Sequence, residues 1–136
     1  MRKHFLRSLP IIATLVSFAQ IVLSHHSLYA EFDLHKKSSL VGVISHVEWG
    51  NPHAWVYLNV ADKRSGQATT WAVQLPSPNI FDRLGWKRDA FKMGTTVTVV
   101  AYPAKDGSRK GSAIEVASSS AKIYAEGPAP ETARSQ

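Results

Sequence analysis

Two adjacent histidines, His25 and His26, stand in the stretch "IVLSHHSLYAEFD" and carry nitrogen donors of the kind that copper and nickel prefer. If the finished protein begins at His25, its first residue offers an α-amine and an imidazole together. Such a terminus can chelate copper, and a third nitrogen from another histidine completes a T-shaped site. The sequence therefore suggests a copper site that begins at His25, with His26, His53 or His46 as the third ligand.

Each of these histidines also has a structural interpretation. The HHS sequence could serve only to direct signal cleavage and to dock the first residues onto the domain. His53 follows Asn51-Pro52 and could bond a backbone carbonyl to hold a turn, instead of binding a metal or moving a proton. His46 is most simply a solvated side chain on a strand. Both interpretations stay open from the sequence alone.

A second group of residues points to binding without a metal. Trp55 and Tyr57 alternate with aliphatic residues in "HAWVYLNVA", and Glu48 and Asn51 come shortly before them. Aromatic side chains of this kind stack on sugars or other ring-bearing ligands, and they also anchor protein partners. The alternative function is therefore an adaptor or ligand-binding protein whose contact face contains Trp55, Tyr57, Glu48 and Asn51. The two aromatic residues could equally pack beneath the rest of the chain.

The residues before His25 have the three parts of a secretory signal. Arg2, Lys3 and Arg7 are basic, residues 9–23 are mostly apolar, and compact residues occupy positions 22 and 24. The apolar stretch is shorter than the roughly 20 residues that cross a bilayer. The sequence predicts a signal peptide over residues 1–24, cut between Ser24 and His25, and a periplasmic or secreted protein without a transmembrane anchor. A cut after Ala19 is the alternative.

Composition narrows the classes of function. The chain has no cysteine, which excludes disulfides, thiolate metal sites, cysteine nucleophiles and a lipid anchor on an N-terminal cysteine. Without residues 1–24, the chain keeps 112 residues and thirteen basic against ten acidic ones, a net charge of +3. A small exported domain of this charge is not expected to bind nucleic acid. Its expected partner is an unidentified protein or small ligand, and anionic surfaces remain compatible.

Motifs typical of enzymes are missing. The sequence contains no G-x-S-x-G, no phosphate-binding loop, no H-E-x-x-H and no close pair of carboxylates in an apolar setting. An S-x-x-K match at residues 119–122 lacks the motifs that accompany it in enzymes. The sequence therefore predicts a binding protein, and a copper-dependent oxidase built on His25 remains an alternative.

From residue 39 onward the chain reads as short strands with turns between them. Strands are predicted at residues 40–49, 53–61, 69–75, 95–102, 112–117 and 121–125. One face of the first strand would carry Val41, Val43, Val47 and Trp49, and one face of the second would carry Ala54, Val56, Leu58 and Val60. If these aliphatic faces join in a hairpin, His46 and Glu48 must share the other face with His53, Trp55 and Tyr57.

A short helix is predicted between the third and fourth strands, with Ser77 as N-cap, Pro78 first and Gly85 at its end. This order indicates an all-β fold, a small OB-like Greek-key barrel of five to six strands over residues 39–125. An SH3-like barrel fits nearly as well. Residues 25–38 would pack on the barrel, residues 126–136 would form a flexible tail, and Trp49 and Trp71 would be core.

Several motifs together resemble a bacterial family of small exported proteins, domain of unknown function family 6152. They are "HHSLYAEFD", "VEWGNPHAWVYLNV", "WAVQLPSPN", "LGWKRD" and "VTVVAYPAKDGS", and they span His25 to about Glu115. The resemblance implies an exported small β-barrel of unestablished activity. It marks as shared the positions His25, His26, Ser27, Asn51, Pro52, His53, Trp55, Gly85, Trp86, Asp106 and Gly107. The sequence departs from the family at "ASSSAKIY", where an Asp-Gly turn is usual.

Overall fold

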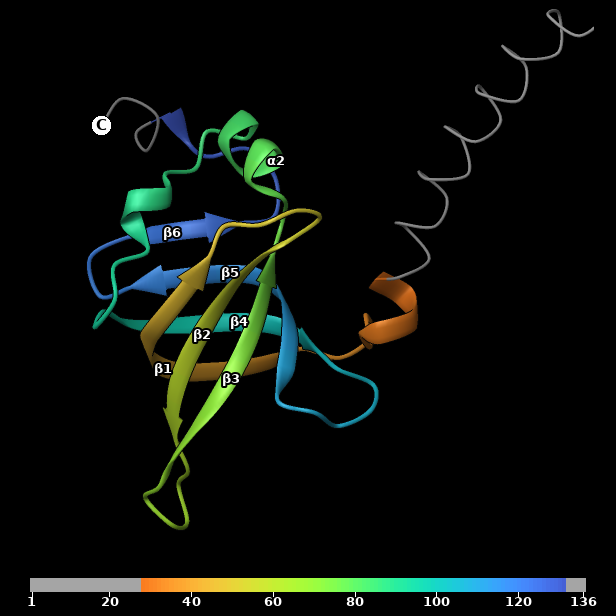
Figure 1. The fold of residues 1–136 in the computed structure, drawn as a ribbon, viewed down its shortest axis with the longest axis vertical. Helices are drawn as coiled ribbons and strands as arrows, with labels where there is room; N and C mark the ends of the chain where they lie inside the picture. The colour runs from red at the N-terminus through yellow and green to blue at the C-terminus, as the bar shows by residue number, and fades with distance from the viewer. Residues whose placement is uncertain (1–27, 132–136) are drawn as a thin grey trace, which may run out of the picture. The chain divides into compact units, whose positions relative to one another are not determined.

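The computed structural model describes residues 28–131, and six strands form most of it (Figure 1). The strands are β1 (Ser38–Glu48), β2 (Ala54–Ala61), β3 (Ala68–Leu75), β4 (Thr96–Pro103), β5 (Lys110–Ser118) and β6 (Lys122–Ala125). Helix α2 (Pro78–Arg83) and a 3-10 helix (Arg88–Ala90) connect β3 to β4. Residues 28–31 form a separate helical turn. None of the helices in the described part of the chain is long and apolar enough to cross a membrane.

The strands close into a five-stranded barrel. Their order in the sheet is β3-β2-β1-β4-β5-β6, and a parallel pairing of β3 with β5 joins the two sides. Strand β1 pairs with two neighbours: its first part pairs with β4 and its last part pairs with β2. Strand β6 is an additional strand on the free edge of β5. The predicted OB-like barrel is thereby confirmed, and its connectivity decides against the SH3-like alternative.

A β-bulge in β1 corrects the predicted faces of this strand. The pairing with β2 shifts between Ile44 and His46, so the side-chain alternation reverses there. Before the bulge, Ile44 is buried, whereas Val41 and Val43 are 59% and 39% exposed, opposite to the prediction. After the bulge, Val47 and Trp49 pack against the core, as predicted. The sequence pattern assumed one continuous alternation, and the additional residue breaks it.

Beyond the bulge, the β1–β2 hairpin brings the predicted aliphatic faces together. Val47 lies opposite Val56, His46 opposite Tyr57 and Glu48 opposite Trp55. On β2, Ala54, Val56 and Leu58 are fully buried, while Trp55 and Tyr57 point to the other side and are partly buried. The prediction that His46 and Glu48 share a face with Trp55 and Tyr57 is therefore confirmed.

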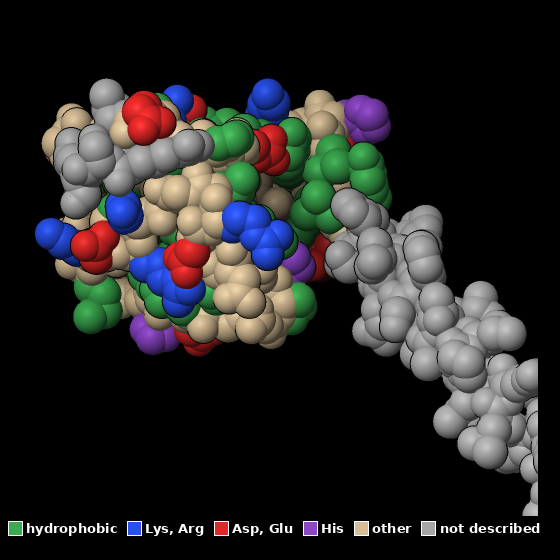
Figure 2. All heavy atoms as spheres, turned by 90° about the horizontal axis from the view of Figure 1, so that it is seen from above, with side chains coloured by type: hydrophobic (Ala, Val, Ile, Leu, Met, Phe, Trp, Pro, Cys, Tyr) green, Lys and Arg blue, Asp and Glu red, His purple; other side chains and the backbone are tan. Residues whose placement is uncertain are grey.

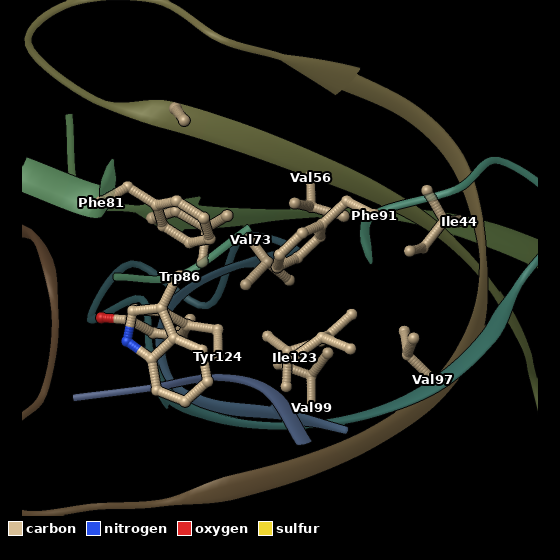
Figure 3. Close-up of a cluster of buried hydrophobic side chains, with 14 of the residues drawn as sticks. Ile44, Val56, Val73, Phe81, Trp86, Phe91, Val97, Val99, Ile123 and Tyr124 are labelled. Atoms are coloured by element: carbon tan, nitrogen blue, oxygen red, sulfur yellow. The ribbon is translucent and has the colours of Figure 1, made fainter. Parts of the chain in front are cut away.

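The core is aromatic near α2 and aliphatic elsewhere (Figure 3). The ring of Phe81 lies 5.2 Å from that of Trp49, 5.7 Å from that of Phe91 and 5.7 Å from that of Tyr124, measured between centroids. Trp86 is the buried tryptophan, 4% exposed, and its Nε1 donates a 2.9 Å hydrogen bond to the carbonyl of Gly127. Trp49 and Trp71, predicted as core, are only partly buried at its edge.

Helix α2 begins and ends as its sequence predicts. The Ser77 hydroxyl accepts a hydrogen bond from the backbone N–H of Ile80, Pro78 is the first helical residue, and Gly85 follows with a φ of 86°. The buried ring of Phe81 fastens the helix to the core.

The segment after β6 differs from the predicted flexible tail. Glu126 donates its backbone N–H to the carbonyl of Ile114, and Ala129, 3% exposed, donates to the carbonyl of Leu84 at 2.7 Å. Residues 126–129 therefore pack beside Trp86, because the indole N–H and the Leu84 carbonyl need partners inside the fold.

Hydrogen bonds of Ser118 close the turn between β5 and β6. The Ser118 hydroxyl accepts a hydrogen bond from the backbone N–H of Ala121 at 3.1 Å and donates to its carbonyl at 3.1 Å. The backbone N–H of Ser118 also donates to that carbonyl at 2.8 Å. These bonds close the turn without a glycine.

Candidate functional site

The candidate site lies on the outer face of the β1–β2 hairpin, where the bulge in β1 turns His46 and Glu48 away from the core. The Ser45 hydroxyl in the bulge donates a 3.1 Å hydrogen bond to the carbonyl of Tyr57 and so ties the bulge to β2. Because directly opposite residues of an antiparallel pair point to the same side, His46 meets Tyr57 and Glu48 meets Trp55. We call these four residues the outer face.

Three side chains of the outer face contact one another. The Tyr57 hydroxyl donates a 3.1 Å hydrogen bond to Oε2 of Glu48. Nε2 of His46 lies 3.5 Å from Oε1 of the same carboxylate, which makes an ion pair when the imidazole is protonated. The rings of His46 and Tyr57 lie 5.7 Å apart between centroids, at 31° to each other. Glu48 therefore holds both neighbours through its two oxygens.

These groups are accessible to a ligand. The side chains of His46 and Glu48 are 58% and 53% exposed, while Trp55 and Tyr57 are partly buried against the sheet. Partial loss of water raises the pKa of the Tyr57 hydroxyl above its ordinary value, and the Glu48 carboxylate raises it further. At neutral pH the hydroxyl keeps its proton. The site can bind through an aromatic surface, a carboxylate and an imidazole, an arrangement suited to recognition.

Sequence patterns did not identify one residue of this region, Gln74. Gln74 on β3 lies opposite Trp55, so the row Glu48, Trp55, Gln74 crosses three strands on one side of the sheet. Gln74 is 6% exposed and is the buried polar residue of the described chain. Its alternation with Val73 and Leu75 was visible in the sequence, but its alignment with Trp55 required the register of β2 and β3.

The predicted metal ligands are not brought together among the described residues. His53 is partly buried directly after the turn, in which the Asn51–Pro52 peptide is cis and Asn51 is exposed. Residues 28–131 contain no group of three or more His, Asp or Glu side chains that could hold a metal ion. His25 and His26, together with the proposed cleavage site at Ser24, lie outside the described residues. A metal site through His25 stays a prediction.

Two hollows occur elsewhere on the barrel. One, of about 320 Å³, lies between the 86–90 segment and the start of β6. The other, of about 730 Å³, lies between the start of β1, the end of β2 and the start of β3, and we call it the β2–β3 groove. Its lining residues are Ser39, Leu40, Val41, Val60, Ala61, Asp62, Lys63, Arg64, Thr69, Trp71 and Arg109. Sequence reasoning missed this groove because it placed Trp71 in the core.

The surface seen from above in Figure 2 mixes basic and acidic side chains and shows no large area of one charge. On the barrel, Arg88 forms an ion pair with Asp82, and Lys122 forms one with Glu115 at 2.7 Å. Arg88 also lies over the ring of Trp49, 5.5 Å from its centroid. Arg88 and Lys122 are therefore both engaged by neighbouring side chains.

Comparison with known proteins identifies the family of this chain. No curated protein matches the chain. Among solved structures, the mitochondrial single-stranded DNA-binding protein Rim1 from S. cerevisiae is similar over 62% of this chain and 93% of its own, with 16% identity and a TM-score of 0.49. Residues 13–113 match the sequence profile of the family of unknown function DUF6152. The chain therefore belongs to the DUF6152 family.

Proposed function

We propose that this protein is an exported, periplasmic binding protein that recognises a sugar ring through its outer face. The observation that carries the proposal is the alignment of Glu48 with Trp55 across the β1–β2 hairpin, on the solvent side of the barrel. It sets an aromatic surface beside a carboxylate that is 53% exposed. Sugars offer an apolar ring face for stacking and hydroxyls that donate to a carboxylate, so both groups would be used.

Geometry supports recognition at this face more than a reaction. Glu48 already accepts a hydrogen bond from Tyr57 and faces His46, so its position is fixed before a ligand arrives. A fixed polar group costs less conformational entropy on binding than a free one. The side chains of His46 and Glu48 are more than half exposed, which suits contact with part of a glycan chain, whereas an enzyme would have to enclose its substrate.

The test is binding of soluble peptidoglycan fragments to the purified protein and to Trp55→Ala, measured by calorimetry. We expect binding by the wild type and its loss in Trp55→Ala, while Met93→Ala serves as the control, because Met93 is 71% exposed outside this face. Tyr57→Phe should keep part of the affinity, since it retains the ring.

The thermal midpoint of each variant separates binding from folding. A fall of more than about 10 °C in Trp55→Ala would show that Trp55 is mainly a structural residue. Unchanged binding by a well-folded Trp55→Ala, or no binding by the wild type, would overturn the proposal.

A transition-metal site is the second candidate, and it rests on His25. The described residues favour it in one respect, because the side chain of His46 is 58% exposed and can reach a ligand from outside. Copper would then be held by the amine and ring of His25 with His26, His53 or His46.

The intact mass of the exported protein, measured under native conditions, tests the metal site. A chain that begins at His25 and carries copper would support it. A chain that begins at Gln20 or keeps its signal would remove the terminal chelate. A Cu(II) affinity that is unchanged after replacing His25, His26 and His53 would contradict the site.

A further inference from the structure

The β2–β3 groove combines an apolar floor with a cationic rim. It lies at the end of the barrel where the β2–β3 hairpin projects, at the bottom of Figure 1, whereas α2 lies at the top. Its volume of about 730 Å³ falls in the range of small-molecule sites, which is about 300–1,000 Å³.

The floor consists of residues that face the barrel interior but are not covered at this end. Trp71 lies opposite Leu58, which is fully buried, so both side chains point inward. Trp71, Leu40 and Val60 pack against the core and remain partly exposed. They present an aromatic ring and two aliphatic side chains to whatever enters the groove.

The rim carries three cations, Lys63, Arg64 and Arg109. Within residues 28–131, no salt bridge is found for any of the three. One carboxylate, Asp62, also lines the groove, and it attracts Arg109 at longer range. The groove therefore keeps an excess of positive charge, in contrast to the paired Arg88 and Asp82 near α2.

Asp62 is committed to its own turn. Its Oδ1 accepts hydrogen bonds from the backbone N–H groups of Arg64 and Ser65, both at 2.8 Å, and from the Ser65 hydroxyl at 3.2 Å. These bonds lower the pKa of Asp62 and fix the turn that holds Lys63 and Arg64. On the other side, the carbonyl of Arg109 accepts a 3.0 Å hydrogen bond from the backbone N–H of Ala72, next to Trp71. Both parts of the rim are thus anchored by backbone contacts.

We propose that the β2–β3 groove binds a small anion that carries an aromatic ring, with the ring on Trp71 and the anionic group between Arg64 and Arg109. Charge complementarity selects the anion, because two guanidinium groups provide paired donors for a carboxylate, sulfonate or phosphate. The partly exposed indole selects the ring. This site is separate from the outer face, so the inference does not depend on the proposed function.

The probe is 8-anilinonaphthalene-1-sulfonate, an aromatic anion whose fluorescence rises in an apolar site. We expect saturable binding to the folded wild-type protein, with affinity reduced roughly tenfold or more in R64Q/R109Q. The matched control is R83Q/K92Q, which removes the same charge from two exposed residues outside the groove.

A second variant avoids changes to the rim. Val41→Glu adds a carboxylate at a groove position that is already 59% exposed, and it should weaken binding by a similar factor. Met93→Glu, at a position that is 71% exposed outside the groove, is its control and should bind as the wild type does.

Several outcomes would overturn the inference. They include absence of saturable binding, unchanged affinity in both groove variants, an equal loss in the control variants, and equal affinity for uncharged 1-anilinonaphthalene. Competition by inorganic phosphate at concentrations as low as those of the aromatic probe would also contradict it, because the indole would then contribute nothing.

Discussion

The Tyr57 hydroxyl donates a 3.1 Å hydrogen bond to the Glu48 carboxylate across β1 and β2, and so links the two strands on the solvent side of the barrel. The contact exists because the bulge at Ser45 reverses the alternation of β1 between Ile44 and His46. Without that additional residue, Glu48 would point toward the core. A backbone irregularity thus creates the outer face.

The first prediction concerns the acidity of Tyr57. Partial burial is the main cause of its raised pKa, and the Glu48 carboxylate adds to it. Glu48→Gln should therefore lower the Tyr57 pKa while leaving it above the ordinary value, because the burial remains. An NMR titration of ring-labelled tyrosine measures this, with Glu115→Gln as the control. A Tyr57 pKa that stays unchanged or rises would show that the carboxylate does not act on the phenol.

The second prediction compares two tryptophans. Trp86 is 4% exposed and donates to the carbonyl of Gly127, so Trp86→Ala should lower the free energy of unfolding by about 3–5 kcal/mol. Trp55 is only partly buried, and Trp55→Ala should cost about 1 kcal/mol. Urea denaturation measures both values. Equal losses would mean that the outer face is as structural as the core.

The third prediction concerns the close approach of β1 and β2 at Gly42. A Cβ at this position would lie 2.9 Å from the backbone oxygen of Asn59 and 2.9 Å from Cγ2 of Val60. Gly42→Ala should therefore destabilise the protein by about 1–3 kcal/mol, since backbone must move. At Gly50 the nearest atom would lie 3.7 Å away, so Gly50→Ala is the matched control. Similar stabilities for the two variants would disprove the close approach.

The fourth prediction is a dependence of stability on pH. The Arg88 guanidinium holds the pKa of Asp82 below its ordinary value of 3.8. A group with a lowered folded-state pKa stabilises the fold above its unfolded pKa, and this contribution disappears as the pH falls through the folded value. Asp82→Asn should therefore lower stability near pH 7, and this loss should shrink as the pH falls below 3.8. Urea midpoints measured over this pH range test the prediction, and a loss that does not change with pH would contradict the ion pair.

The sequence predicted where the strands lie along the chain and which residues share the outer face, because alternation and turn residues mark both. Joining the aliphatic faces placed Glu48 and Trp55 on a common face, whereas their direct pairing is known only from the structure. Ser77, Pro78 and Gly85 marked the helix through local hydrogen bonding and backbone geometry, which neighbouring residues alone decide.

Features that depend on distant contacts could not be predicted. The bulge that exposes Val41 and Val43 depends on how β1 divides its pairing between β2 and β4. Burial of Trp86 in place of Trp71 depends on the segment after β6, which supplies the Gly127 carbonyl. The β2–β3 groove requires the parallel pairing of β3 with β5, which brings Arg109 beside Trp71. The spacing of residues along the sequence does not predict these long-range contacts.

The four tryptophans provide the most direct test of the proposed binding face, because each indole N–H reports on a different part of the barrel. Trp55 lies on the outer face, Trp71 in the groove, and Trp49 and Trp86 at the aromatic core. The measurement is a titration of ¹⁵N-labelled protein with soluble peptidoglycan fragments, followed at the indole signals. We predict a saturable shift of the Trp55 signal with the other three nearly unchanged. A Trp55 signal that does not move, or a shift confined to Trp71 or Trp86, would contradict the proposed function.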